Sequence, residues 1–103
     1  MIIDKTLIKS FVKTTERAAY GASLFKGKND KISADKAAVD EMRNELNKIH
    51  MKGTIVIGEG EMDDAPMLYV NEKVGTNRGD ELDIAVEILT DLNRLRNVFV
   101  VIN

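Results

Sequence analysis

Four carboxylates close together in the segment from Gly58 to Pro66 are the side chains of this chain best suited to chemistry. Glu59, Glu61, Asp63 and Asp64 stand within six residues, directly after a short run of β-branched residues. Hard cations such as Mg²⁺ and Mn²⁺ prefer oxygen ligands and often combine carboxylates with the phosphate oxygens of a substrate. The pattern therefore suits a phosphate-handling cation site, although composition alone favours an acidic surface loop.

Other common sites agree less well with this segment. The acidic residues keep the alternate spacing of an EF-hand loop, but its sixth position is Asp64 rather than glycine and its twelfth is Val70 rather than glutamate. The glycines on either side of Glu59 are no dinucleotide fingerprint, because the third glycine is absent and the acidic residues would repel a pyrophosphate. The single histidine, His50, is expected at the end of a helix in a surface role.

Two helices are expected before the acidic segment. Apolar residues at three- and four-residue steps predict a helix over about 5–25. A second helix is predicted from Ser33 or Ala34 to Lys48, with Asp30 or Ser33 capping its start. Asp35 would then lie in its first turn, where the helix dipole favours a carboxylate, and Gly53 would close the segment.

Several strands are expected around and after the acidic segment. The β-branched run 54–57 predicts a short strand buried on both faces, and 67–74 is a candidate for another. A turn is expected at 75–80. From Leu82 apolar and polar residues alternate as in a strand, although Val86 to Leu95 also fits a helix, and 98–102 is typical of a final strand. Helices followed by strands predict an α/β or layered α+β domain.

Composition excludes several classes of protein. The 103 residues suffice for one domain, and 15 basic against 17 acidic side chains leave no positive surplus for nucleic acid. The longest apolar run, Val98 to Ile102, is far short of the roughly 20 residues of a membrane span. Without a signal-peptide pattern or any cysteine, the chain is expected to be cytoplasmic.

The acidic segment and its surroundings resemble the signature of the class II fructose-1,6-bisphosphatases, some of which also act on sedoheptulose 1,7-bisphosphate. The resemblance runs from Gly53 to Asp63, through 65–69 and 72–76, and on to 83–86. Upstream positions also fit, so that it covers about residues 11–86: Thr15, Glu16, Ala18, Ala19, Gly27, Ala34, Asp35, Ala37, Ala38, Val39, Met42 and Arg43.

This resemblance implies a metal-dependent sugar phosphatase with the layered α/β fold of the inositol monophosphatase-like superfamily. Asp35 and Glu59 correspond to metal ligands of the family, and Asp63 to a residue implicated in catalysis. The implied cofactor is Mn²⁺ or Mg²⁺, and the implied reaction is hydrolysis of the C1 phosphate ester of a sugar bisphosphate. A homo-oligomer is among the expected assemblies.

The chain departs from the family pattern after Val86. There the family continues Asp-Pro-x-Glu-Gly-Thr, whereas residues 87–92 are Glu-Ile-Leu-Thr-Asp-Leu. Glu87 keeps a carboxylate but is one methylene longer, which displaces its oxygens beyond the tolerance of a tight Mg²⁺ site. Residues 87–103 are therefore interpreted as a divergent tail on a single, truncated domain spanning 1–103.

Two functions remain open on this basis. One is the bisphosphatase activity of the family. The other is a non-catalytic, truncated or frameshifted fragment, at most a weak divalent-cation binder or a partner of a full-length subunit. Unless residues 89–103 take the place of the missing strands, we expect exposed apolar surface and self-association.

Overall fold

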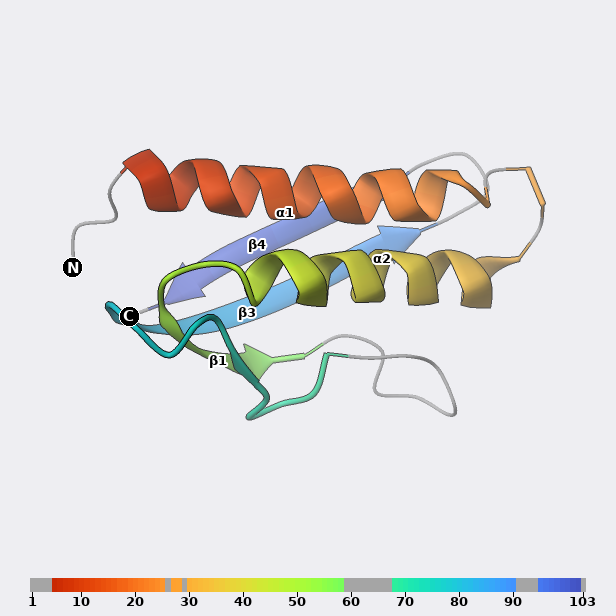
Figure 1. Ribbon diagram of the computed structural model, residues 1–103. Helices are drawn as coiled ribbons and strands as arrows, with labels where there is room; N and C mark the ends of the chain where they lie inside the picture. Colours follow the sequence, from red (N-terminus) through yellow and green to blue (C-terminus); the bar gives the residue numbers. More distant parts are fainter. Residues whose placement is uncertain (1–4, 26, 29, 59–67, 91–94, 103) are drawn as a thin grey trace.

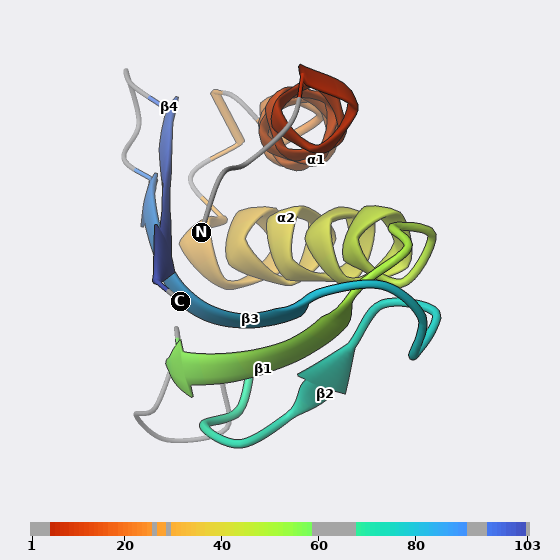
Figure 2. The same cartoon turned by 90° about the vertical axis from the view of Figure 1, so that its left-hand side faces the viewer.

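Two helices pack on one face of a four-stranded sheet. The computed structural model describes residues 5–25, 27–28, 30–58 and 68–86, together with the backbone of 87–90 and 95–102. Both helices lie on the same side of the sheet in two perpendicular views (Figures 1 and 2). The expected α/β class is confirmed, with these elements in chain order: α1 (Lys5–Ser23), α2 (Lys31–Leu46), β1 (Lys52–Ile57), β2 (Lys73–Val74), β3 (Glu81–Thr90) and β4 (Leu95–Ile102).

The sheet is mixed, with the strand order β2-β1-β3-β4. β1 and β3 run parallel, with Gly53 opposite Leu82 and Ile55 opposite Ile84, while β2 and β4 are antiparallel to their neighbours. Residues 81–90 are thus a strand throughout, and the helical alternative for this region is wrong. The final strand is confirmed, and because β4 pairs with β3 along Asp83–Thr90, the tail supplies β3 with a neighbour.

The helices begin and end close to their expected positions, with one consequence for Asp35. The carboxylate of Asp30 accepts a hydrogen bond from the Ser33 amide at 3.0 Å and caps α2. Because this cap starts the helix at Lys31, Asp35 lies beyond the first turn, which contains no acidic residue. The expected interaction of Asp35 with the amino-terminal dipole is therefore wrong.

The core lies between the helices and the inner face of the sheet. In β1 and β3 the residues that face the helices are buried, whereas Lys52, Glu81 and Asp83 on the outer face are exposed. Period-two alternation thus assigns the side chains to their faces as far as Ile55 and Ile84, beyond which the register of β1 on β3 shifts. The largest apolar side chains with almost no exposure are Val39, Met42, Leu46, Met51, Ile55, Leu68, Leu82 and Ile84.

Three expectations about the strands are wrong. The run 54–57 is not buried on both faces, since Ile57 is 57% exposed. β1 begins at Lys52, so Gly53 belongs to the strand instead of closing the preceding segment. In the described part of the candidate strand 67–74, residues 68–74, only Lys73–Val74 is regular, because a turn in which Asn71 has a φ of 71° interrupts it. The turn expected at 75–80 is present, with positive φ at Gly75 and Gly79.

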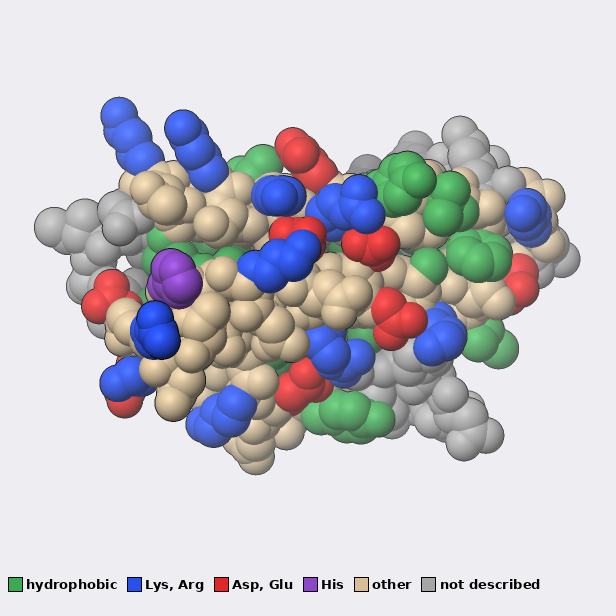
Figure 3. Space-filling view, in the orientation of Figure 1, with side chains coloured by type: hydrophobic (Ala, Val, Ile, Leu, Met, Phe, Trp, Pro, Cys, Tyr) green, Lys and Arg blue, Asp and Glu red, His purple; other side chains and the backbone are tan. Residues whose placement is uncertain are grey.

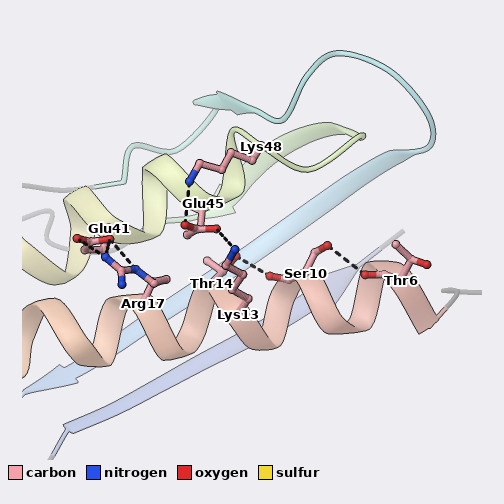
Figure 4. A network of polar contacts seen from close by, with 8 residues as sticks. All are labelled: Thr6, Ser10, Lys13, Thr14, Arg17, Glu41, Glu45 and Lys48. Atoms are coloured by element: carbon pink, nitrogen blue, oxygen red, sulfur yellow. Dashed lines mark hydrogen bonds and ion pairs between the residues drawn. The ribbon is translucent and has the colours of Figure 1, made fainter.

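Polar contacts hold the two helices together along their shared boundary (Figure 4). The guanidinium of Arg17 donates two hydrogen bonds of 3.2 Å to the carboxylate of Glu41. Glu45, which is only 8% exposed, accepts from Lys48 at 3.1 Å and lies 4.0 Å from the ammonium of Lys13. The contacts made by Arg17 and Lys13 therefore join α1 to α2.

Candidate functional site

Asp35 lies on α2 at the end of the sheet toward which β1 and β3 run. Figures 1 and 2 agree that α2 is antiparallel to β1, so that its first turns lie at the carboxyl end of that strand. The side chain of Asp35 is half-buried. Open α/β sheets bind ligands beyond the carboxyl ends of their strands, so this is the end of the domain where a site is expected.

The other two predicted site residues, Glu59 and Asp63, lie outside the described residues. Gly58 precedes their segment and Leu68 follows it, and both flanking residues are described. A Cβ placed on Gly58 would overlap the carbonyl oxygen of Leu68. The backbone at one flank thus packs directly on the backbone at the other, beside the end of β1.

Backbone hydrogen bonds secure the chain where it returns from this segment. The Asn71 amide donates to the Ile55 carbonyl at 2.6 Å, and the Ile55 amide donates to the Glu72 carbonyl at 2.9 Å. A turn closes between Tyr69 and Glu72, because the Glu72 amide donates to the Tyr69 carbonyl at 2.9 Å. Residues 69–72 are therefore fastened to β1.

The side chain of Glu72 extends this attachment to α2. Its carboxylate accepts from the Arg43 guanidinium at 2.7 and 3.1 Å and from the Tyr69 amide at 3.1 Å. The Arg43 side chain is 29% exposed and that of Glu72 18%. The hydrogen bond from Arg43 lowers the pKa of Glu72, and the same hydrogen bond raises the pKa of Arg43. Both groups are therefore held in their charged forms.

The pairing of Arg43 with Glu72 was not expected from the sequence. The partners are 29 residues apart, and no local periodicity connects a helix residue with a turn at that distance. The only sequence signal was that both positions fit the family resemblance, without any role attached to them.

A groove of about 560 Å³ lies elsewhere, at the amino ends of β1 and β3. Basic and acidic side chains both line it, among them Lys52, Lys73, Glu81 and Asp83. The ammonium of Lys73 donates to the Thr54 hydroxyl at 2.9 Å beside it. Since the amino and carboxyl ends of the strands lie at opposite ends of the sheet, this groove is remote from Asp35 and is not part of the candidate site.

The surface of the two helices is charged along most of their length and more apolar at one end (Figure 3). Basic and acidic side chains are interspersed over α1 and α2, whereas hydrophobic side chains gather where α1 ends and α2 begins. Exposed residues at that end include Tyr20, Leu24 and Ile32. The neighbourhood of Asp35 is therefore more apolar at its surface than the remainder of the two helices.

The part of the chain that the structure describes brings together no group of three histidine, aspartate or glutamate side chains able to hold a metal ion. Asp35 alone among the expected ligands belongs to that part, and its carboxylate is the donor type that Mn²⁺ and Mg²⁺ prefer. The donor chemistry thus agrees with such a cation. None of the described helices is long and apolar enough to cross a membrane.

Comparison with known proteins finds relatives that are named as bisphosphatases. Fructose-1,6-bisphosphatase 1 class 2 of Escherichia coli is 54% identical over 83 residues, which are 81% of this chain and 25% of that protein. D-fructose 1,6-bisphosphatase class 2/sedoheptulose 1,7-bisphosphatase of a Synechococcus strain is 51% identical over 85 residues, covering 82% of this chain and 25% of the relative.

The Haemophilus influenzae class 2 fructose-1,6-bisphosphatase is 52% identical over 85 residues, again 82% of this chain and 26% of that protein. The chain thus spans about a quarter of the length of these relatives. Residues 5–95 also match the family described as bacterial fructose-1,6-bisphosphatase, glpX-encoded. Because this match covers most of the sequence, the chain belongs to the family of glpX-encoded bacterial fructose-1,6-bisphosphatases.

Proposed function

We propose that this chain carries part of the metal site of a bisphosphatase that hydrolyses the C1 phosphate ester of fructose 1,6-bisphosphate. The observation that carries the proposal is the family match over residues 5–95, which includes all three predicted site residues. The names of the relatives specify fructose 1,6-bisphosphate and, for some, sedoheptulose 1,7-bisphosphate. The substrate class is accordingly a sugar bisphosphate.

Asp35 and Glu59 are the residues that would hold Mn²⁺ or Mg²⁺, and Asp63 is the catalytic residue in this proposal. The position of Asp35 near the carboxyl end of β1 supports the assignment, because Glu59 follows that strand by only two residues. A bound cation would supply positive charge to the phosphate and Lewis-acid activation. Carboxylates by themselves would repel a bisphosphate, so the proposed ligands require their cation before they can receive substrate.

For the complete domain we propose the layered fold of the inositol monophosphatase-like superfamily. The support is the stacking of a helical layer on one face of a mixed sheet. That arrangement leaves β1 and β3 with their outer face available to a further layer.

A second candidate function is a non-catalytic one, as a weak cation binder or a partner of a full-length subunit. The observation that favours it is the sequence of residues 87–92, which replaces the family's Asp-Pro-x-Glu-Gly-Thr with Glu-Ile-Leu-Thr-Asp-Leu. Groups that act together in one site are strongly non-additive, so losing several of them costs orders of magnitude in rate.

The test combines Mn²⁺ binding with phosphate release from fructose 1,6-bisphosphate. We expect Mn²⁺ to bind the purified chain and the affinity to fall at least tenfold in Glu59→Gln and in Asp35→Asn. Glu16→Gln, on the exposed side of α1, removes a carboxylate elsewhere and should leave binding unchanged. Phosphate release that disappears in Glu59→Gln would establish the enzyme. Binding without release would establish the second candidate, and absence of binding would overturn both forms of the metal site.

A further inference from the structure

The sheet is hollowed at the amino ends of β1 and β3, where the groove of about 560 Å³ lies. A cleft of this size is large enough for a small molecule. Residues of three neighbouring strands line it, and Figure 2 shows β2, β1 and β3 side by side in that order. Because the groove lies at the opposite end of the sheet from Asp35, a ligand bound there would be independent of the proposed metal site.

The charges in the groove are ordered by strand. Lys73 of β2 and Lys52 of β1 form its basic side, whereas Glu81 and Asp83 of β3 form its acidic side. Strand pairing fixes this order, because Thr54 lies opposite Lys73 on one neighbour and opposite Asp83 on the other. Neighbouring strands lie about 4.8 Å apart, so β2 and β3 are separated by roughly 10 Å. Positive and negative charge therefore occupy opposite sides of one groove.

These four charges do not neutralise one another. Lys52 lies directly opposite Glu81 in the pairing of β1 with β3. Yet none of the ion pairs within the described residues includes Lys52, Lys73, Glu81 or Asp83. Glu81 and Asp83 are instead two positions apart on one face of β3, about 6.6 Å along the strand. Two such carboxylates repel each other, and a positive group between them would relieve that repulsion.

The basic side also offers hydrogen-bond donors to an anion. The ammonium of Lys73 has three N–H groups and donates one of them to the Thr54 hydroxyl at 2.9 Å. That hydroxyl accepts in this contact, so its own proton is left to donate. Asn77 also lines the groove and carries a side-chain amide. The acidic side offers only acceptors, which suit an ammonium group.

Backbone hydrogen bonds hold the walls of the groove in place. The Lys52 amide donates to the Asp80 carbonyl at 2.8 Å, and the Asn77 amide donates to the Met51 carbonyl at 3.1 Å. Sites on strands are more precise than sites on loops. The backbone positions of the charges are therefore set before any ligand arrives.

We propose that this groove binds a small zwitterionic molecule, with its anionic group at Lys52 and Lys73 and its cationic group at Glu81 and Asp83. A purely anionic ligand would be repelled by the two carboxylates, and a metal cation by the two lysines. A molecule that carries both charges, several bonds apart, meets the opposite charge at each end. Amino acids and short peptides with a carboxylate and a distant amine have this chemistry.

The experiment titrates the isotope-labelled chain with three matched probes and follows its amide chemical shifts at low ionic strength. The zwitterionic probe is 6-aminohexanoate, and the controls are hexanoate and hexylammonium, which each keep one of its charges. We expect 6-aminohexanoate to bind in the millimolar range, since contacts between exposed charges are weak. The shifts should be concentrated at 52–54, 73–77 and 81–83. Each single-charge probe should bind about fivefold more weakly or worse.

Variants test whether the four charges are responsible. Lys52→Met and Glu81→Gln should each weaken the binding of 6-aminohexanoate by about two- to fivefold. Lys9→Met and Glu16→Gln remove the same charges from exposed positions of α1 and should bind like wild type. The double variant Lys52→Glu/Glu81→Lys exchanges opposite charges between neighbouring strands at constant net charge. It should bind about fivefold more weakly or worse, because the order of the charges is lost.

Several results would overturn the proposal. One is the absence of shifts in the groove at about 50 mM 6-aminohexanoate, well above the expected dissociation constant. Equal binding of the three probes would show that the groove does not require both charges. A double variant that binds like wild type would show that the order of the charges is irrelevant to binding.

Discussion

The two faces of the sheet differ sharply although the same strands form both of them. On the inner face, against the helices, Ile55, Leu82 and Ile84 are at most 1% exposed. On the outer face, Lys52, Glu81 and Asp83 are exposed. The alternation of strand residues therefore separates a core that stabilises the fold from a surface that contributes little to it.

The exposed surface around the strands differs between their two ends. The amino ends of β1 and β3 carry charges and hydroxyls, which water solvates well. Apolar side chains are exposed at the carboxyl end of β1 and in the turn after the acidic segment, where Ile57 and Tyr69 are each 57% exposed and Val70 is 46% exposed. Single exposed apolar residues are ordinary, but a group of them beside a proposed ligand-binding end is typical of a surface that something else covers.

The largest expected effect comes from comparing two isoleucines of β1 that are two residues apart. Ile55 is completely buried and Ile57 is 57% exposed. Ile55→Ala should lower the free energy of unfolding by about 2–5 kcal/mol through lost burial and the cavity that it leaves. Ile57→Ala should change it by about 0.5 kcal/mol or less. Urea denaturation followed by circular dichroism measures both, and equal losses would show that Ile57 is covered after all.

A smaller effect is expected where the inner face leaves no space. A Cβ on Gly53 would lie 2.9 Å from Cγ2 of Val74 and 3.0 Å from Cε of Met51. Gly53→Ala should therefore cost about 1–3 kcal/mol through overpacking, despite the better strand propensity of alanine. Thr54→Ala, one residue further on, loses only the contact with Lys73 and is the control. Thermal unfolding midpoints distinguish the two, and a Gly53→Ala variant as stable as wild type would contradict this packing.

The sequence predicted the parts of the fold that depend on local periodicity. Both helices, the Asp30 cap and the strands β1, β3 and β4 follow from the spacing of apolar residues and from residue types at helix starts. The strand predicted at 67–74 was too long. The turn ending at Glu72 is stabilised by contacts to β1 and α2, and no local sequence pattern indicates such contacts. Burial of 54–57 on both faces was also wrong, since a β-branched run does not reveal how many layers surround it.

For the same reason, the sequence predicted some residues of the candidate site and its surroundings but not others. Asp35, Glu59 and Asp63 came from the family resemblance, and residue types alone left an acidic surface loop as the simpler interpretation. The ion pair of Arg43 with Glu72 is not predictable from the sequence, because it depends on a contact between α2 and a distant turn. Long-range ion pairs of this kind have no sequence period, so that only a structure brings the partners together.

The stability of the fold should fall in acid as the ion pair between Arg43 and Glu72 is lost. Arg43 holds the pKa of Glu72 below its ordinary value of 4.5, so the pair stabilises the fold at neutral pH. That stabilisation is present above the ordinary value and is lost as the pH falls through the lowered one. Between pH 6 and pH 3, wild type should lose about 1 kcal/mol more stability than Glu72→Gln, which cannot titrate. Parallel loss in both, by urea denaturation at each pH, would refute the contribution of the pair.

The smallest effect on folding is expected from charging the exposed apolar end of β1, and the change should appear in association instead. Ile57→Asp leaves the core untouched, so the free energy of unfolding should change by about 0.5 kcal/mol or less. If the exposed apolar group at Ile57, Tyr69 and Val70 meets a second copy of the chain, the wild-type weight-average mass in sedimentation should rise with concentration. Ile57→Asp should abolish that rise, because a buried, unpaired carboxylate is costly at an interface. Ile8→Asp, at an apolar residue of α1 that is 50% exposed, is the control and should associate like wild type. A wild-type chain that stays monomeric would show that this apolar group tolerates water, whereas loss of association in Ile8→Asp alone would transfer the interface to the helical layer.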